Sequence, residues 1–246
     1  MLYGRNAVGE ALLGRRVAHR LLLAEHMRDD QRVTRILEEA ESRTLPIIRV
    51  PRARLDEITQ GANHQGIALE TSSFWYVPLE ELLEIPGTIL VLDHLQDPQN
   101  FGTLMRTADA CGVCGVVIPE NRAVAVTPSV VNASAGAVEH LRIARVVNLS
   151  RALDDLKRAG WWITCLDSSD GATDLYATDV PRPVALVVGA EGSGVGQNVR
   201  RRCDLVVRLP MRGKITSLNA ATAGSIALYE ILRRGPDKEE PVPSSS

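Results

Sequence analysis

The sequence has few aromatic residues, few lysines and no long apolar run. Aromatic residues make up 4% of its 246 positions, and three of its 28 basic residues are lysines. No apolar stretch reaches the roughly 18 to 20 residues that a membrane-spanning helix needs. The segment "MLYGRNAVGEALLGRR" lacks the apolar centre of a signal peptide. We therefore expect no membrane contact and a cytoplasmic location.

Net charge and cysteine content are also low. The formal net charge of −2 provides no overall positive field that would attract a polyanion. Four cysteines fit a reducing compartment, and Cys111 and Cys114 form a C-x-x-C pair. A structural zinc site takes about four ligands, and the sequence offers no second pair to complete one. We predict no metal site, and we favour two small buried side chains at a helix-to-strand turn over a redox pair.

The basic residues are mostly arginine and occur in clusters. A planar guanidinium suits phosphates and base edges better than an ammonium does, although codon bias of the source genome would also enrich arginine. The densest cluster follows a glycine-rich segment and consists of Arg200, Arg201, Arg202, Arg208, Arg212 and Lys214. Clustered arginine is typical of nucleic-acid partners, but on its own it does not establish one.

Hydrophobic patterns divide the chain into two α/β units. In residues 1–72, short helical and extended patterns alternate and predict a small α/β sandwich. Residues 73–87 contain two prolines and predict a linker with one helical turn. Over residues 88–235, apolar strands alternate with helices, which predicts a parallel sheet covered on both faces. Residues 236–246 predict a disordered tail.

Three segments place polar residues where a predicted strand ends, which is where ligands bind in open α/β sheets. In "LDHLQDPQNFGTLMRTADACG", Asp97 and Pro98 make a turn, and Asn100 is a plausible helix N-cap. Arg106 follows about two turns into that helix, where it either snorkels to solvent or has a function.

The second segment, "ALVVGAEGSGVGQNV", resembles a nucleotide-binding loop only superficially. Its glycines match neither the dinucleotide spacing G-x-G-x-x-G nor the phosphate-loop spacing G-x-x-x-x-G-K. Glu191 would repel a phosphate and suits a cation, an amine or a hydroxyl. The segment therefore predicts close approach of backbone to a ligand other than a pyrophosphate.

The third segment is "LPMRGKITSLNAATAGSIALYEILRR". Ser217 and Asn219 stand at the start of a helix expected from about Ser217 to Arg234, where they serve as caps or have a function. The small residues that follow imply close packing against another backbone, either at a dimer interface or within the chain.

In this order and with this spacing, "DPQNFGTLMRTA", "VVGAEGSGV" and "LPMRGKITSLNAATA" resemble the three motifs of the SpoU (TrmH-type) RNA ribose 2′-O-methyltransferases of the SPOUT class. The segment "VNASAGAVEHLRI", largely in a helix expected over residues 127–140, is similar to the S-x-G-A-x-E segment of that family. Residues 1–72 look like its RNA substrate-binding module. The resemblance implies an α/β fold whose C-terminal parallel-sheet domain has a deep trefoil knot, preceded by a small L30e-like α/β domain.

The resemblance also implies a cofactor and a set of site residues. The cofactor is S-adenosylmethionine in a bent conformation. Because glycines have no side chain, they would let it approach the backbone closely. Its binding positions correspond to Gly189, Leu209, Leu218 and Met211. The family's functional polar positions correspond to Asn100, Arg106, Glu191, Ser217 and Asn219. These would align a ribose 2′-oxygen with the methyl group and help to remove its proton.

In such enzymes Arg106 has been assigned as the general base. A guanidinium is protonated at ordinary pH, so we favour a role in holding the adjacent phosphate and stabilising the developing alkoxide. Glu191 would then orient Arg106 or accept the proton.

Family likeness further implies a homodimer whose active site is completed across the interface. The expected partner is RNA, and the expected target is a guanosine in the peptidyl-transferase loop of 23S rRNA. The alternatives within the class are a tRNA ribose 2′-O-methyltransferase and an antibiotic-resistance rRNA methyltransferase. Outside the class they are a non-catalytic RNA-binding protein and a nicotinamide-dependent oxidoreductase, although the glycine spacing argues against the latter.

Overall fold

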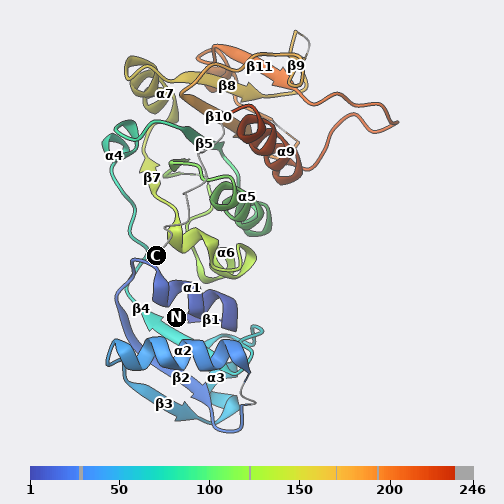
Figure 1. The fold of residues 1–246 in the computed structure, drawn as a ribbon. Helices are drawn as coiled ribbons and strands as arrows, with labels where there is room; N and C mark the ends of the chain where they lie inside the picture. The colour runs from blue at the N-terminus through green and yellow to red at the C-terminus, as the bar shows by residue number, and fades with distance from the viewer. Residues whose placement is uncertain (28–29, 122, 170, 193, 236–246) are drawn as a thin grey trace, which may run out of the picture.

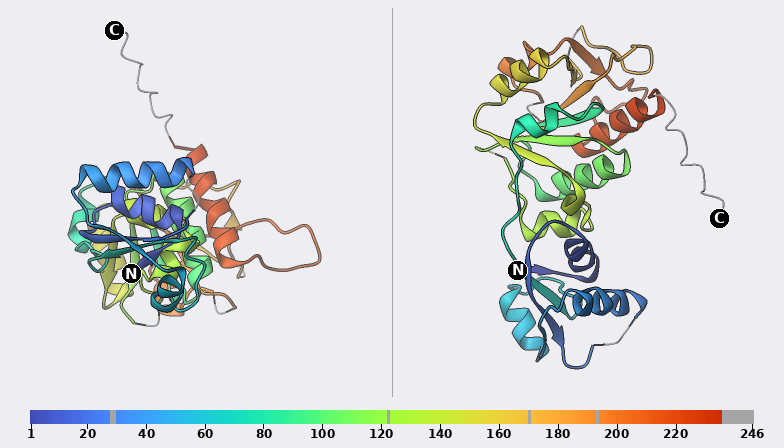
Figure 2. Two further views of the ribbon diagram at one scale, coloured as in Figure 1. Left: turned by 90° about the horizontal axis from the view of Figure 1, so that it is seen from below. Right: turned by 60° about the vertical axis from the view of Figure 1, so that its left-hand side comes forward.

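The structure is a computed structural model that describes residues 1–27, 30–121, 123–169, 171–192 and 194–235. Two α/β units lie one beyond the other in an elongated arrangement (Figures 1 and 2). No helix of the described ranges is long and apolar enough to cross a membrane. The tail predicted over residues 236–246 lies outside the described residues.

The first unit is a four-stranded sheet with helices on both faces, as predicted. Its strand order is β1-β4-β2-β3, and β2 pairs with β3 in parallel and with β4 antiparallel. Alternate residues of β2 face opposite sides, so that Leu21 packs with α1 and α2 while Leu22 packs with Leu55 of α3. The elements are β1 (Leu2–Tyr3), α1 (Arg5–Leu13), β2 (Ala18–Ala24), α2 (Gln31–Ser42), β3 (Ile47–Val50), α3 (Arg52–Ile58) and β4 (Ile67–Thr71).

The segment after β4 contains the expected helical turn, α4 (Leu79–Leu83). It packs on the second unit, because Val77 forms a β-bridge with Ala144 and Leu82 is fully buried. A Cβ atom at Gly115 would lie 2.5 Å from Leu82 Cδ2, so the glycine permits this close approach. Residues 77–83 therefore belong to the hydrophobic core of the second unit.

The second unit contains a seven-stranded sheet in which every described pair of neighbouring strands is parallel, as the strand and helix alternation predicts. The strand order is β7-β6-β5-β10-β8-β11-β9. Its strands are β5 (Thr88–Asp93), β6 (Gly115–Pro119), β7 (Ile143–Val146), β8 (Trp162–Leu166), β9 (Thr173–Asp174), β10 (Val184–Gly189) and β11 (Leu205–Arg208).

Helices cover both faces of this sheet (Figure 1). Leu186 and Val188 of β10 face α5 and α9, whereas Ala185 and Val187 face the side of α4 and α7. The remaining elements are α5 (Pro98–Ala110), α6 (Pro128–Ala133), the 3-10 helix η1 (Ala137–His140), α7 (Leu149–Arg158), α8 (Gln197–Arg200) and α9 (Ala220–Arg233). Because all strands run the same way, their carboxyl ends meet at one edge, and Gly189 stands beside Asp93 there.

Two expected helices differ in the structure. The one expected over residues 127–140 is divided into α6 and η1, because Ala135 and Gly136 take left-handed backbone with φ of 53° and 92°. The turn brings η1 against α1, where a Cβ atom at Gly136 would lie 2.5 Å from Glu10 Cβ. Helix α9 begins at Ala220 instead of Ser217, because Asn219 is its N-cap.

A buried ion pair joins the two units. Arg16 Nε donates to Glu139 Oε2 at 2.8 Å, and the two side chains are 7% and 1% exposed. The Arg16 guanidinium lies 5.0 Å from the centroid of the Phe74 ring, in the connecting segment. His140 also pairs with Glu10 at 2.7 Å. These contacts hold the first unit against the α6 and η1 end of the second.

Candidate active site

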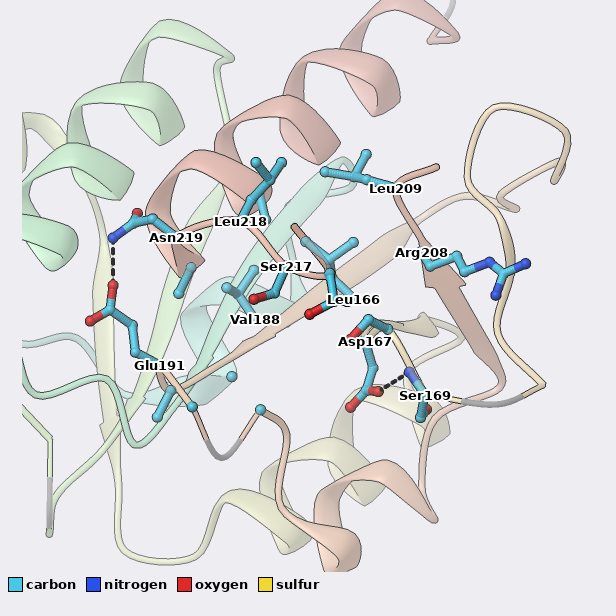
Figure 3. Close-up of a pocket in the computed structure, with 18 of the residues that line it drawn as sticks. Leu166, Asp167, Ser169, Val188, Glu191, Arg208, Leu209, Ser217, Leu218 and Asn219 are labelled. Atoms are coloured by element: carbon cyan, nitrogen blue, oxygen red, sulfur yellow. Dashed lines mark hydrogen bonds between the residues drawn. The ribbon is translucent and has the colours of Figure 1, made fainter. Parts of the chain in front are cut away.

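A cavity of about 560 Å³ lies at the carboxyl ends of β8, β10 and β11, next to the start of α9 (Figure 3). Its polar groups gather at two places. Glu191 and Asn219 lie at one end, and Asp167 and Arg208 lie at the other. The positions proposed for the cofactor all line this cavity, namely Gly189, Leu209, Met211 and Leu218. Of the five proposed catalytic residues, those that line it are Glu191, Ser217 and Asn219.

Three side chains from three different elements meet at the Glu191 end. Asn100 Nδ2 donates to Glu191 Oε1 at 2.8 Å, and Asn219 Nδ2 donates to the same oxygen. Asn219 Nδ2 also lies 2.9 Å from Asn100 Oδ1. Glu191 follows β10, Asn100 belongs to α5 and Asn219 precedes α9, so the cluster joins the first, second and third sequence motifs.

The structure corrects the expected role of Asn100 as a helix cap. Asp97 is the N-cap of α5, and its Oδ2 accepts a hydrogen bond from Asn100 N at 2.9 Å, with Pro98 following in the first turn. Proline lacks an N–H and suits that position, so the cap falls on the residue before it. The Asn100 side chain is thereby left to contact Glu191.

Asn219 combines the two roles that its position suggested. Its Oδ1 accepts hydrogen bonds from Ala221 N at 2.9 Å and Thr222 N at 3.1 Å, which caps α9. Its Nδ2 points the other way, toward Glu191 (Figure 3). The backbone of α9 therefore fixes the direction in which the Asn219 amide donates.

The glycines of the second motif serve the loop itself. Ala190 and Gly194 exchange backbone hydrogen bonds of 3.1 and 3.0 Å, so the loop folds back against the end of β10. A Cβ atom at Gly189 would lie 2.2 Å from the carbonyl carbon of Gly194. Gly192 and Gly194 take left-handed backbone, with φ of 75° and 63°. From the sequence alone, these glycines are explained by space for a ligand. The structure adds a second reason, which is the close packing of the loop against its own backbone.

The structure does not bring Arg106 into the cluster. Arg106 lies six positions after Asn100, which places the two side chains roughly 120° apart around α5. Arg106 is exposed, and no hydrogen bond or ion pair to it is found within the described part of the chain. The predicted contact between Glu191 and Arg106 is therefore absent from this single chain as described.

Sequence reasoning missed the residues that follow β8. Asp167, Ser168 and Ser169 line the cavity next to Leu166, the last residue of β8, and Asp167 Oδ1 accepts a hydrogen bond from Ser169 N at 2.7 Å. The signal was available, because a polar run directly after a buried parallel strand marks the ligand edge of such a sheet. Arg208, at the end of β11, was noticed only as part of a basic cluster.

The small residues of α9 pack within the chain. A Cβ atom at Gly224 would lie 2.7 Å from Leu104 Cδ2 of α5 and 3.2 Å from Val188 Cγ2 of β10. Thr107 Oγ1 and Ser225 Oγ lie 2.8 Å apart, where α5 and α9 run side by side. The small-residue face is thus explained by packing inside the chain, and the exposed face of α9 carries Tyr229.

The cysteine pair lies away from this cavity. Cys111 ends α5 and is buried, while the Cys114 thiol donates to Thr88 O at 3.1 Å. Burial raises the pKa of both thiols to about 11. Among the residues that the structure describes, no three His, Cys, Asp or Glu side chains gather closely enough to hold a metal ion.

Comparison with known proteins gives consistent matches along the chain. Residues 87–229 match the model of the SpoU rRNA Methylase family, and residues 1–77 match the model for RNA 2′-O ribose methyltransferase substrate binding. The chain is 40% identical, over 237 residues, to the putative TrmH family tRNA/rRNA methyltransferase YacO of Bacillus subtilis (strain 168), and the match covers 94% of each protein.

Solved structures show the same architecture. An AdoMet-bound rRNA methyltransferase from Sinorhizobium meliloti superposes with a TM-score of 0.79 at 27% identity, covering 94% of this chain and 85% of that one. The SpoU methyltransferase AviRb from Streptomyces viridochromogenes, in complex with AdoMet, shares the fold with a TM-score of 0.80 at 24% identity, covering 94% and 88%. With its three motifs meeting at Glu191 and a family model matching more than half of its length, the chain belongs to the SpoU rRNA Methylase family.

Proposed function

We propose that the protein transfers a methyl group from S-adenosylmethionine to a ribose 2′-hydroxyl in structured RNA. One observation carries the proposal: a cavity of about 560 Å³ opens beside the contact between Glu191, Asn100 and Asn219. The cavity can hold a small organic cofactor, since ligand pockets span roughly 300 to 1,000 Å³. The Glu191 carboxylate beside the cavity can accept a hydrogen bond from a hydroxyl group of the substrate.

The lining of the cavity fits S-adenosylmethionine. Leu209 and Leu218 supply apolar surface for a heterocycle, and Gly189 exposes backbone. Asp167 and Arg208 supply groups for the polar ends of the ligand. The cofactor brings a methyl group on a positively charged sulfur, which makes it reactive toward an oxygen nucleophile.

The proposed reaction gives each polar residue a role. Asn100 and Asn219 both donate to Glu191 Oε1, so they orient the carboxylate. Oε2 then accepts a hydrogen bond from the ribose hydroxyl and takes its proton as the oxygen gains the methyl group. Ser217, which is exposed at the rim, completes the positioning of the ribose. Arg106 binds the phosphate next to that ribose and stabilises the developing alkoxide.

We propose that Arg106 acts at the site of a second copy of the chain. In this chain it is exposed and does not contact Glu191, which is itself exposed. A homodimer with a two-fold axis would bring the exposed face of α5 from one copy toward the cluster of the other. This arrangement uses Arg106 without any movement of α5.

The finer fold assignments belong to the same proposal. We infer a trefoil knot formed by the segments after β10 and β11, supported by the position of β10 between β5 and β8. The long connection between β11 and α9, which extends from the body of the molecule in Figures 1 and 2, would form part of it. We assign residues 1–72 to an L30e-like RNA-binding domain, residues 73–87 to the linker and residues 88–235 to the methyltransferase domain.

For the substrate we favour a guanosine of 23S rRNA, modified in the cytoplasm. The match of residues 1–77 to an RNA substrate-binding model supports structured RNA. Names of relatives such as YacO include both tRNA and rRNA, so a tRNA ribose is the second candidate. Mapping of 2′-O-methyl sites in rRNA and tRNA from a deletion strain and its parent decides between them. Loss of a tRNA mark with 23S rRNA unchanged would reject the rRNA substrate.

The dimer proposal has its own test. Arg106→Ala and Glu191→Gln variants are each expected to be inactive, while both retain cofactor binding in calorimetry. Mixing them with subunit exchange should restore about a quarter of the wild-type rate, because half of the dimers then contain one intact site. No recovery on mixing, with exchange verified by mass spectrometry, would place Arg106 and Glu191 in the same copy's site.

A further inference from the structure

A second cavity of about 410 Å³ lies at the same edge of the sheet, beyond β5, β6 and β7. The loop that follows β10 separates the two cavities. Glu191 and Gly194 line the first cavity, whereas Gly196 and Gln197 line the second. None of the roles assigned above uses a residue of the second cavity.

A buried carboxylate orients a histidine in this cavity. Asp93 is 1% exposed, and its Oδ1 lies 2.5 Å from His94 Nδ1. Its Oδ2 accepts a hydrogen bond from Gly196 N at 2.7 Å. Since a carboxylate accepts, Nδ1 carries the proton and Nε2 of a neutral His94 is an acceptor. Within the described ranges, no hydrogen bond is found to Nε2.

The backbone holds His94 in an unusual conformation. Its φ is 59°, in the left-handed region that side chains with a Cβ seldom occupy. Such strain persists where surrounding contacts impose it, and it often accompanies functional sites. The side chain is about half exposed, at 48%. The imidazole is therefore held at the cavity wall with one nitrogen available.

The rest of the lining consists of neutral polar and apolar groups. The amides of Asn148 and Gln197 come from the starts of α7 and α8, and Val147, which precedes Asn148, is 78% exposed. Asn148 Oδ1 accepts from Arg151 N at 3.1 Å, which leaves its Nδ2 as a donor. Among the described residues that line the cavity there is no arginine or lysine, so a phosphate would lack a permanent counter-charge. An uncharged heterocycle with donors and acceptors on its edge fits better.

Two short segments connect this cavity to the proposed reaction centre. His94 precedes Asp97, the cap of the helix that carries Asn100. Gly196 ends the loop that carries Glu191, and Asp93 binds that glycine. Both walls of the second cavity are thus continuous with residues that meet in the catalytic cluster. A group in the second cavity would lie across one loop from the reacting ribose.

We propose that the second cavity binds one unstacked nucleobase of the RNA substrate, close in sequence to the methylated nucleotide. His94 Nε2 and the amides of Asn148 and Gln197 read the edge of the base, while Val147 contacts its face. This proposal rests on RNA being the substrate. It assigns His94 to RNA recognition, apart from cofactor binding and methyl transfer.

The test combines a His94→Asn variant with RNA in which single bases are removed. Asparagine tolerates left-handed backbone and can still donate to Asp93, so the fold is preserved, yet it is too short to reproduce Nε2. The RNA is the rRNA or tRNA fragment identified by methylation mapping. Wild-type protein should lose about 10-fold in affinity when one particular base near the methylated ribose is absent. His94→Asn should bind intact RNA about 10-fold more weakly and be insensitive to that same removal.

Controls separate this cavity from the rest of the enzyme. Calorimetry should give cofactor affinity within twofold of wild type, and the effect on methyl transfer should fall on KM for RNA more than on kcat. Glu84→Gln, at an exposed position that ends α4 and has no assigned role, should behave as wild type. Gln197→Ala, at the start of α8, should reproduce the insensitivity and provides a second measurement if His94→Asn does not fold.

The outcomes are distinguishable from failure of the proposed reaction. Binding is measured without methyl transfer. If mapping finds no methyl mark that depends on the protein, the proposed reaction is rejected, and the same base removals are then made in the rRNA or tRNA fragment that binds wild-type protein most tightly. Equal sensitivity of both variants and wild type to every base removal would overturn the assignment. Binding of a free nucleoside that depends on His94, with RNA affinity unchanged, would overturn it too, since the ligand would then be a small molecule.

Discussion

The Asn219 side chain caps α9 with its oxygen and donates to Glu191 with its nitrogen. The orientation of the amide is therefore set by the backbone of α9, and the carboxylate of Glu191 is oriented in turn. A helix terminus and a contact of the proposed catalytic cluster share one side chain, so stability and activity should respond separately to different substitutions at this position.

Asn219→Ser should preserve the cap and remove the donor. A serine hydroxyl accepts from the same backbone N–H groups, so the melting temperature should stay close to wild type. Asn219→Ala removes both functions and should cost about 1 kcal/mol of stability. Both variants should lose at least about 100-fold in methyl transfer, comparable to loss of other preorganised hydrogen-bond donors. Full activity of Asn219→Ser would show that the contact with Glu191 is dispensable.

Gly189→Ala should disrupt the loop between β10 and α8. The added Cβ would lie 2.2 Å from the Gly194 carbonyl carbon, and backbone there cannot yield as a flexible side chain does. We expect cofactor affinity, measured by calorimetry, to fall at least about 10-fold as the cavity wall shifts. The matched control is Gly9→Ala in α1, where the Cβ would meet Ile36 at 3.6 Å, an ordinary contact. That control should leave cofactor affinity unchanged and slightly stabilise the fold.

Breaking the Arg16 and Glu139 pair should destabilise the junction of the two units. Glu139→Leu leaves a guanidinium that is only 7% exposed without its partner, and loss of one member of a buried pair costs about 3–5 kcal/mol. The double variant Arg16→Met and Glu139→Leu should recover much of that loss. Chemical denaturation measures both, and the exposed pair Arg20 and Glu70 is the control, with an effect below about 1 kcal/mol. Additive losses in the double variant would argue against direct coupling.

Glu230 should make stability fall in acid. Hydrogen bonds from Arg233 and Arg234 lower the pKa of Glu230 from 4.5 to about 2. Because the pKa is lower in the folded state, this contribution is complete above about pH 4.5 and is lost as the pH falls toward 2. Glu230→Gln should therefore be less stable than wild type at pH 7, by about 1 kcal/mol, and the difference should shrink as the pH falls from 4.5 through about 2 in denaturant titrations. Glu38→Gln, at an exposed position of α2, should show no such dependence.

The order of strands and helices could be predicted because their patterns are local. Buried parallel strands such as β10 are continuously apolar, and helices such as α2 keep Val33, Ile36 and Ala40 on one face. The division into α6 and η1 was not predicted, since it follows from contact between Gly136 and α1, far away in sequence. Local periodicity contains no information about such a contact.

At the site, the family motifs predicted cavity residues that follow β10 and β11, but they predicted neither the residues after β8 nor the arrangement of the side chains. Asp97 was the better cap of α5 because Pro98 follows it, and this left Asn100 for Glu191. Arg106 lies on a different face of α5 from Asn100. A match to a sequence motif does not show which face of a helix each residue occupies. His94 and Asp93 were passed over because they look like the end of a strand, and only the left-handed backbone of His94 brings the pair together at a cavity.

The cluster around Glu191 also has a consequence for how the protein is made. Asn100 and Asn219 lie 119 positions apart, and translation supplies them in that order. On the proposed assignment, residues 1–72 can fold when they leave the ribosome, because domains fold as units during synthesis. The proposed methyl-transfer site must wait for the cap of α9. If both assignments hold, a nascent or truncated polypeptide would gain its RNA-binding surface well before it gained any chemistry.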